Sequence, residues 1–304
     1  MRAADVNGLC HGFHGREHTA LAEQDDVARH RAHMPEGTSV ILDARSLATA
    51  HRRLAEILRP GMSVLDVGCG TGAITRGIAE AVGPSGRVVG VDVNPGLIAR
   101  ARQAHDGVPG LSFEVADLFG LPYQGEFDVV TAARVLQWLA DPLAALRGLT
   151  RAAKPGGLCL VLDYDHGRAT WEPEPPEGMR AFYAAFLHWR AEAGMDNALA
   201  DHLPALFAAA GLEDAASTVQ DEVSRRGDPD FSARLGIWAE VAATRGHQMV
   251  ADGAISEAER ARAEAEYREW IAREARSQTL YLRAVEGRRP GSGRAVPSSA
   301  GADR

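Results

Sequence analysis

The sequence predicts an α/β fold: a doubly wound, mostly parallel sheet of seven strands with a helical lid inserted between the late strands. Short apolar runs alternate with helical runs from residue 63 to residue 164. The apolar runs are continuous rather than alternating, which is typical of strands covered on both faces. After Tyr164 the alternation stops, and a proline-rich loop and long helical patterns follow. These three observations fix the fold class.

The expected strands are the apolar runs of the chain. The first five cover residues 62–68, 87–93, 111–117, 127–133 and 156–164, and two later ones cover 217–223 and 279–287. Helical runs follow the first, second and fourth strands, at 73–83, 95–105 and 142–153. Pro95 stands near the first turn of the second helix, where proline is tolerated. This spacing implies βαβ units and therefore parallel neighbours.

Further helices are expected on both sides of the alternating region. A polar amphipathic run covers 16–34, and a second helix covers 43–61 and stops at Pro60-Gly61. Later helical patterns cover 179–194, 199–211, 231–250 and 256–275, and their aromatic residues recur at the spacing of a buried helix face. The final stretch is rich in Gly, Pro and Ser, and we expect it to be disordered.

The composition narrows the class of partner. The 304 residues carry 33 Lys and Arg against 41 Asp and Glu, a net charge of −8, which makes a nucleic acid a poor partner. We find no apolar run long enough to cross a bilayer and no signal-peptide core at the N-terminus. The three cysteines are far apart and form no CxxC pair, so a reducing cytoplasm is the simplest location. We expect no metal, since Gly12 and Gly15 interrupt the only histidine cluster.

Three glycines within five positions, Gly68, Gly70 and Gly72, follow the first strand. In open α/β sheets ligands bind beyond the carboxyl ends of the strands, and this loop lies there. Glycines let the chain turn tightly and bring its N–H groups close to a ligand. We therefore expect a larger side chain at Gly68 or Gly70 to fill the space of a bound ligand.

Two ligand classes use such a loop. Gly68, Gly70 and Ala73 satisfy the GxGxxA pattern of dinucleotide sites, so the glycines alone do not decide between them. Asp66, two residues before Gly68, favours the other class. A carboxylate there repels a pyrophosphate but attracts a ligand that carries an ammonium group.

The segment "VLDVGCGTG" resembles motif I of the class I S-adenosylmethionine-dependent methyltransferases. It is followed in order by "VVGVDVN", "FEVADLFGLPYQGEFDVV" and "RAAKPGGLCLVLDY", so the resemblance covers residues 63–164. It implies a Rossmann-like methyltransferase fold of the small-molecule type, with S-adenosyl-L-methionine as the cofactor.

The resemblance also assigns roles to individual residues. Gly68, Cys69, Gly70 and Gly72 would shape the pocket for the methionine part, with Cys69 as a small space-filling side chain and Asp66 acting from beneath the loop. Asp92, followed by Val93, would accept hydrogen bonds from both ribose hydroxyls, a role that its place about 20 residues past the loop also favours. The adenine amino group would be met by Asp117 and the Leu118 backbone. Ala133 and Arg134 would offer their backbone carbonyls near the amino-acid end of the cofactor.

The implied reaction moves a methyl group from a sulfonium to a nucleophile, which requires alignment and the exclusion of water, and sometimes a base. Asp163, Asp165 and His166 follow the fifth strand and could face the acceptor; the alternative is a wet surface loop. His14 lies in "CHGFHGREHTALAEQ", which resembles an N-terminal segment that closes over the cofactor in some small-molecule members. Trp138 is a candidate substrate contact, or else part of the core.

We expect four regions: N-terminal helices that close over the cofactor (1–60), the cofactor-binding core (61–168), a helical lid with the last strands (169–286) and a disordered tail (287–304). The favoured function is methylation of a small molecule at O, N or C, possibly in natural-product or secondary metabolism. A protein of this fold that binds the cofactor without methyl transfer stays open, as does, less favoured, a nicotinamide oxidoreductase. The acceptor, the base and the oligomeric state stay open as well.

Overall fold

The computed structural model describes residues 26–35, 42–43 and 45–291. Its strands form one eight-stranded sheet of order β3-β2-β1-β4-β5-β8-β6, with β7 paired to β8 off this path. The strands are β1 (Ser63–Val67), β2 (Arg87–Asp92), β3 (Leu111–Val115), β4 (Phe127–Ala133), β5 (Ala153–Glu172), β6 (Glu213–Val219), β7 (Glu222–Arg225) and β8 (Ser277–Arg288). The first five pair in parallel, and β8 runs antiparallel to β5, β6 and β7. The mostly parallel sheet is as predicted.

The late strands differ from the expectation in three ways. The run 217–223 is split between β6 and β7, so an eighth strand joins the predicted seven. Strand β5 is 20 residues long and crosses the boundary expected at residue 168. Strand β8 reaches Arg288, so a disordered tail from residue 287 is wrong at its start; residues 292–304 lie outside the described part.

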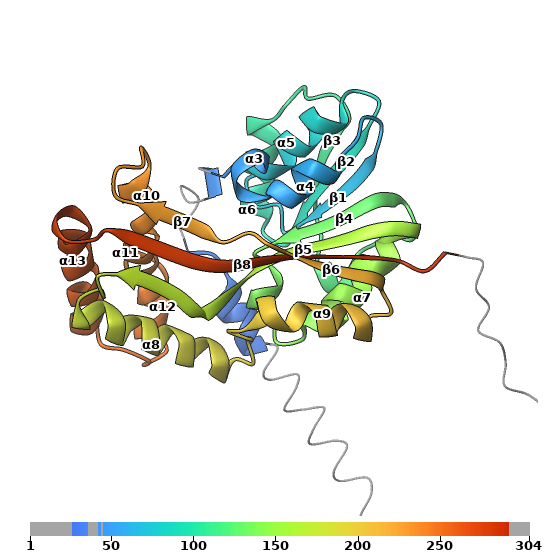
Figure 1. The fold of residues 1–304 in the computed structure, drawn as a ribbon. Coiled ribbons are helices and arrows are strands. Elements are labelled where there is room, and N and C mark those ends of the chain that lie inside the picture. Colours follow the sequence, from blue (N-terminus) through green and yellow to red (C-terminus); the bar gives the residue numbers. More distant parts are fainter. Residues whose placement is uncertain (1–25, 36–41, 44, 292–304) are drawn as a thin grey trace, which may run out of the picture.

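Helices cover both faces of the sheet (Figure 1). On one face lie α3 (Leu47–Ala50), α4 (Arg52–Ile57) and α5 (Ala73–Val82), whose buried side chains join the apolar cluster of β1 and β5. A second cluster holds side chains of α7 (Pro142–Ala152) and α9 (Leu199–Ala209). Helix α6 (Pro95–Ala104) packs beside β2 and β3, and short helices η1 (Leu118–Gly120) and η2 (Leu136–Trp138) follow β3 and β4.

The remaining helices are inserted between the late strands, as expected. Helix α8 (Glu177–Glu192) and α9 lie between β5 and β6, and α10 (Phe231–Leu235), α11 (Ile237–Ala243), α12 (Arg245–Ala251) and α13 (Glu257–Arg273) lie between β7 and β8. The single helix predicted over 231–250 is therefore wrong. The chain breaks at Gly236, between α10 and α11, and again at Thr244, whose hydroxyl donates to the Glu240 carbonyl at 2.6 Å and competes with the helix ladder.

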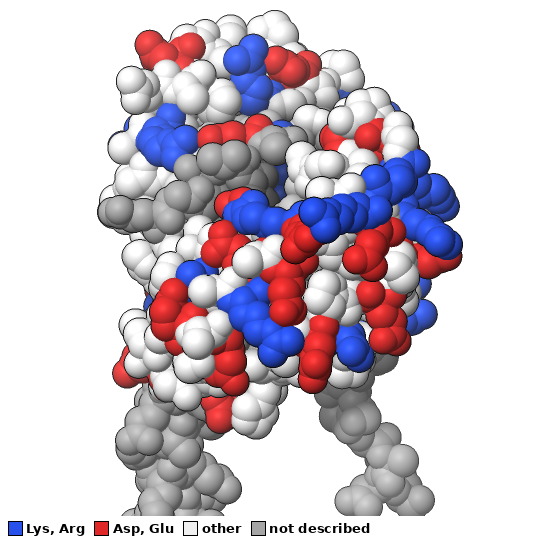
Figure 2. Space-filling view, turned by 90° about the vertical axis from the view of Figure 1, so that its left-hand side faces the viewer, with Lys and Arg blue, Asp and Glu red and all other residues white. Residues whose placement is uncertain are grey.

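The outer surface of the insertion carries mixed charge. Helix α13 begins with a capping box between Ser256 and Glu259. Along it, Arg262 pairs with Glu266 and Arg268 with Glu264 at helical spacing. Figure 2 shows acidic and basic side chains interspersed over this side of the molecule. In the described part of the chain, no helix is long and apolar enough to cross a membrane.

Candidate functional site

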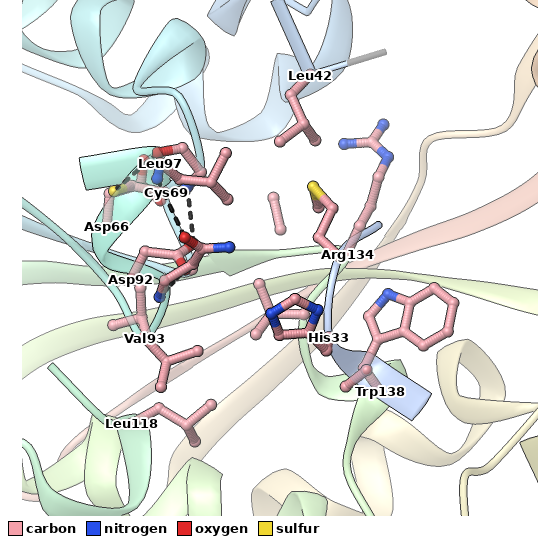
Figure 3. Close-up of a pocket in the computed structure, with 18 of the residues that line it drawn as sticks. His33, Leu42, Asp66, Cys69, Asp92, Val93, Leu97, Leu118, Arg134 and Trp138 are labelled. Carbon is pink, nitrogen blue, oxygen red and sulfur yellow. Dashed lines mark hydrogen bonds between the residues drawn. The ribbon is translucent and has the colours of Figure 1, made fainter. Parts of the chain in front are cut away.

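A cavity of about 560 Å³ opens at the carboxyl ends of the parallel strands. Figure 3 shows the carboxylates of Asp66 and Asp92 on one side of it and the rings of His33 and Trp138 on the other. Most of the residues expected from the sequence lie in its lining: Asp66, Gly68, Cys69, Gly70, Asp92, Val93, Asp117, Leu118, Ala133, Arg134 and Trp138. The parallel strands bring them together because their carboxyl ends share one edge.

The amides of the glycine loop are already used within the chain. The N–H groups of Gly68 and Cys69 both donate to the Val91 carbonyl, at 2.7 and 3.0 Å. The Gly70 N–H donates to Asp92 Oδ2 at 3.0 Å. A phosphate on these amides would have to displace a carbonyl and a carboxylate, so the loop does not fit the pyrophosphate of a dinucleotide.

Neighbouring side chains leave little room for a side chain at any of the three glycines. All three have a positive φ, from 56° to 79°. A Cβ at Gly68 would lie 2.4 Å from Val135 Cγ2, and one at Gly70 would lie 3.0 Å from Leu42 Cδ1. Gly72 is absent from the pocket lining, and a Cβ there would strike the Phe113 ring at 2.6 Å. Gly72 therefore shapes the start of α5, not the pocket.

Asp66 lies beneath the loop and is almost fully buried. Burial raises its pKa to about 7; the Thr75 hydroxyl, which donates to Oδ2 at 2.7 Å, opposes this, and the nearby Asp92 adds to it. A cation bound in the cavity would favour the ionised form. Burial also raises the pKa of the Cys69 thiol, with Asp66 adding to it, so Cys69 is unsuited to act as a thiolate.

Asp92 ends β2 and organises the turn that follows. Its Oδ1 accepts from the Asn94 N–H at 2.9 Å, while Oδ2 accepts from Gly70. Burial raises the pKa of Asp92, although these N–H donors oppose the rise. Val93, the next residue, is 65% exposed and lines the cavity.

Asp117 follows β3 and is held at both oxygens. Oδ1 accepts from the Phe119 N–H at 2.9 Å, and Oδ2 pairs with Arg29 at 2.8 Å. Burial disfavours its charge, but these two partners outweigh it and lower the pKa of Asp117. Arg29 belongs to a helical segment, residues 26–32, within the N-terminal region (1–60) that was expected to close over the cofactor.

Two arginines from the insertion stack on Trp138, a contact that no pattern in the sequence predicts. The guanidinium carbon of Arg245 lies 3.9 Å from the Trp138 ring centroid, and that of Arg190 lies 4.5 Å from it. Arg245 also donates to the carbonyls of residues 31–33. It thereby ties the N-terminal segment to α12 at the edge of the cavity.

Arg134 was expected to act through its carbonyl, and its side chain proves to be a structural centre. The carbonyl accepts from Gln137 Nε2 at 3.3 Å. The guanidinium is buried, donates to the Tyr164 hydroxyl at 2.9 Å and forms an ion pair with Glu222. Its φ of 63° is unusual for a residue with a side chain.

Asp163 and His166 are neither loop residues nor part of this pocket, which corrects both expectations. They lie within β5 and are buried. His166 Nε2 shares a hydrogen bond of 2.6 Å with Gln137 Oε1, and burial keeps its pKa well below the usual value. Asp165, also in β5, is buried as well and is absent from the lining. His14 lies outside the described residues.

The residues present fit one kind of ligand. Carboxylates at successive strand ends suit a diol and an exocyclic amino group, and a buried acid under the loop suits an ammonium. S-Adenosylmethionine carries all three groups. Among the described residues, no group of three or more His, Cys, Asp or Glu side chains could hold a metal ion.

Comparison with known proteins agrees with this geometry. Residues 58–205 match the model of a methyltransferase domain family. The ubiquinone/menaquinone biosynthesis C-methyltransferase UbiE of Burkholderia vietnamiensis is 40% identical over 119 residues, which is 38% of this chain and 47% of that protein. The demethylmenaquinone methyltransferase of Lactococcus lactis is 37% identical, over 35% and 43%. The chain thus spans less than half the length of these curated relatives.

Solved structures share the fold. The phosphoethanolamine N-methyltransferase 2 of Haemonchus contortus, in complex with S-adenosyl-L-methionine, has a TM-score of 0.51 and 19% identity, over 80% of this chain and 52% of that one. The [4+2]-cyclase SpnF has a TM-score of 0.50 and 23% identity, over 90% and 93%. Residues 58–205 are therefore a methyltransferase domain, and the fold is that of the class I S-adenosylmethionine-dependent methyltransferases.

Proposed function

We propose that this protein transfers a methyl group from S-adenosylmethionine to a small-molecule acceptor. The observation that carries the proposal is the row of three carboxylates, Asp66, Asp92 and Asp117, around a loop whose amides are already paired. That arrangement favours a ligand with a diol and an amine over one with phosphates.

Each residue would bind one part of the cofactor. Asp92 would accept from the ribose hydroxyls, and Asp117, with the Leu118 backbone, would meet the adenine amino group. Each of their carboxylate oxygens has a second lone pair beyond the bond it already accepts. Val93 and Leu118 would contact the adenine ring, which accounts for the exposure of Val93. Asp66 would act on the ammonium from beneath the loop.

The chemistry needs alignment and a dry site more than a reactive side chain. The cofactor supplies a methyl group on a positively charged sulfur, which an acceptor attacks in line. The segment at 28–34 lines the cavity and is held to the core by Arg29 and to the insertion by Arg245. We infer that it closes over the cofactor and that the insertion covers the acceptor, which excludes water.

The acceptor side of the cavity is mostly apolar. Trp138, Met34, Leu42 and Leu139 line it. The volume lies in the range of sites that hold small molecules. A compact acceptor with an apolar, planar part would suit this wall. The related protein UbiE, named a C-methyltransferase of ubiquinone and menaquinone biosynthesis, supports an acceptor of this kind.

A second function stays open because one similar structure is a cyclase. The resemblance to the [4+2]-cyclase SpnF concerns the fold alone. Binding of the cofactor and its turnover are separate properties of a site. In this alternative the chain would hold S-adenosylmethionine without consuming it.

The test combines titration with product analysis. Wild-type protein, Asp92→Asn and the exposed control Asp106→Asn are titrated with S-adenosylhomocysteine by calorimetry. We expect binding that Asp106→Asn preserves and Asp92→Asn weakens about 10- to 100-fold, since Asp92 would lose charge-assisted bonds. Incubation with S-adenosylmethionine and a panel of small aromatic acceptors should release S-adenosylhomocysteine. Binding without release favours the second function, and absence of binding contradicts both.

A further inference from the structure

Four arginines line the cavity, and they differ in what holds them. Arg29 pairs with Asp117, Arg134 pairs with Glu222, and Arg245 donates to backbone carbonyls. The Arg45 backbone N–H donates to the Leu42 carbonyl, but its guanidinium forms no hydrogen bond and no ion pair with any residue that the structure describes. An arginine side chain has five N–H donors, so this one is open to a ligand in the cavity.

The surroundings of Arg45 make its charge costly while no anion is bound. Burial lowers its pKa, and the nearby Arg134 guanidinium adds to this. Glu222 and Tyr164 favour its charge from a distance, but the Glu222 carboxylate is already engaged by Arg134. A partly buried cation without a close partner would gain from an anionic ligand.

The position of Arg45 identifies the part of the cofactor that it would reach. Leu42, three residues earlier, lies against Gly70: a Cβ at Gly70 would lie 3.0 Å from Leu42 Cδ1. Arg134, whose charge acts on Arg45, follows β4 directly, so Arg45 lies at the glycine-loop and β4 side of the cavity. At the other end of the cavity, the acid Asp117 is already paired with Arg29. The cavity is thus polarised, with an open cation where the amino-acid part would lie.

We propose that Arg45 binds the carboxylate of the methionyl part of the cofactor. The proposal rests on the proposed function, because it places the same ligand in the same cavity. The carboxylate is the only anionic group of S-adenosylmethionine, and a guanidinium matches its two oxygens with parallel donors. Asp66 and Arg45 would then hold the ammonium and the carboxylate of one amino acid.

The test compares two ligands that differ in this part. S-Adenosylhomocysteine carries the amino acid, and methylthioadenosine keeps the adenine, ribose and thioether but lacks it. Calorimetric titrations use wild-type protein, Arg45→Met, Arg45→Lys and the matched control Arg52→Met, which replaces an exposed arginine of α4. We expect Arg45→Met to lose about 10- to 100-fold in affinity for S-adenosylhomocysteine and none for methylthioadenosine. Arg45→Lys should lie between, and Arg52→Met should match the wild type.

A second measurement needs no variant. The wild-type protein should bind an amide analogue of S-adenosylhomocysteine, in which the carboxylate is neutralised, about 10- to 100-fold more weakly than the acid. Equal affinity for the two, or an Arg45→Met variant that loses both nucleosides equally, would overturn the assignment of Arg45. If wild-type protein binds no S-adenosylhomocysteine, the proposed function itself fails.

Discussion

Asp163 is a residue whose environment decides its charge. Its side chain is fully buried in β5, and Oδ1 has no hydrogen-bond partner among the described residues. Burial raises its pKa to about 7, against the Gln137 N–H and the Arg134 and Arg190 charges. In the unfolded chain the same carboxyl has a pKa near 3.9. Folding therefore favours the protonated acid, and this contribution to stability is lost as pH rises from about 4 to about 7.

This pKa predicts how stability depends on pH. From pH 6 to pH 8, a folded-state pKa of about 7 costs about 1.4 kcal/mol of unfolding free energy for one such group. Asp163→Asn cannot ionise, so its stability should fall by about 1.4 kcal/mol less than that of wild type over this interval. Urea unfolding at both pH values measures the difference, in which the similar contribution of Asp66 cancels. Asp106→Asn, on the surface, serves as the control; a pH dependence of Asp163→Asn equal to that of wild type would refute the assigned pKa.

At the scale of elements, the loop between β1 and α5 is fixed by close packing. Three left-handed residues turn the chain, and its amides bind back to the end of β2. This makes the loop rigid before any ligand arrives, so the cavity is preformed on that side. Of the three glycines, Gly68 is the one where an added Cβ would have the closest contact. That contact is with Val135, which caps the short helix η2 after β4. The loop thus holds the carboxyl ends of β1, β2 and β4 in fixed positions relative to one another.

The loop predicts unequal costs for two glycine substitutions. Gly68→Ala and Gly107→Ala both place a side chain at positive φ, at 72° and 74°, which costs about 1–2 kcal/mol. A Cβ at Gly107 meets nothing within 4 Å, whereas one at Gly68 meets Val135 Cγ2 at 2.4 Å. We expect Gly68→Ala to lose a further 1–3 kcal/mol, about the cost of overpacking, in urea unfolding. Equal losses would mean that Val135 moves aside freely.

At the scale of the whole molecule, the insertion and the sheet share one core. A continuous apolar cluster contains Val64 and Leu160 of the sheet together with Trp189, Trp238 and Tyr267 of the inserted helices. The N-terminal segment adds polar links, since Arg31 pairs with Asp252 at 3.2 Å and donates to the Trp189 carbonyl. A lid that shares the core cannot be removed without exposing the sheet.

Shared packing predicts a single unfolding transition. All five tryptophans lie between residues 138 and 270, so their fluorescence reports mainly on the insertion and its contacts. Far-UV circular dichroism reports on the whole chain. The two signals should give the same urea midpoint, and saturating S-adenosylhomocysteine should shift both equally. A fluorescence midpoint at lower urea would show instead that the insertion unfolds on its own.

Local patterns accounted for much of the fold and of the cavity. Continuous apolar runs gave the parallel strands, and the glycine-rich turn and strand-end acids gave most of the lining residues on the core side. Boundaries failed where tertiary pairing extends a strand, as in β5, which continues to Glu172 beside β8. The single helix predicted over 231–250 is wrong because the chain breaks at Gly236 and again at Thr244, where the threonine hydroxyl competes for a backbone carbonyl; apolar periodicity does not record such a competition.

The sequence by itself determined the parallel pairing of the first five strands and the edge at which the acids gather, because parallel βαβ units place all their carboxyl ends together. Only the tertiary structure decided which groups at that edge remain free to bind a ligand. Pairing of the loop amides with Val91 and Asp92, burial of Asp163, and the position of Arg45 in the lining of the cavity all depend on packing between elements. Arg245 reaches a carbonyl 214 residues away, and a contact of that separation leaves no trace in local sequence.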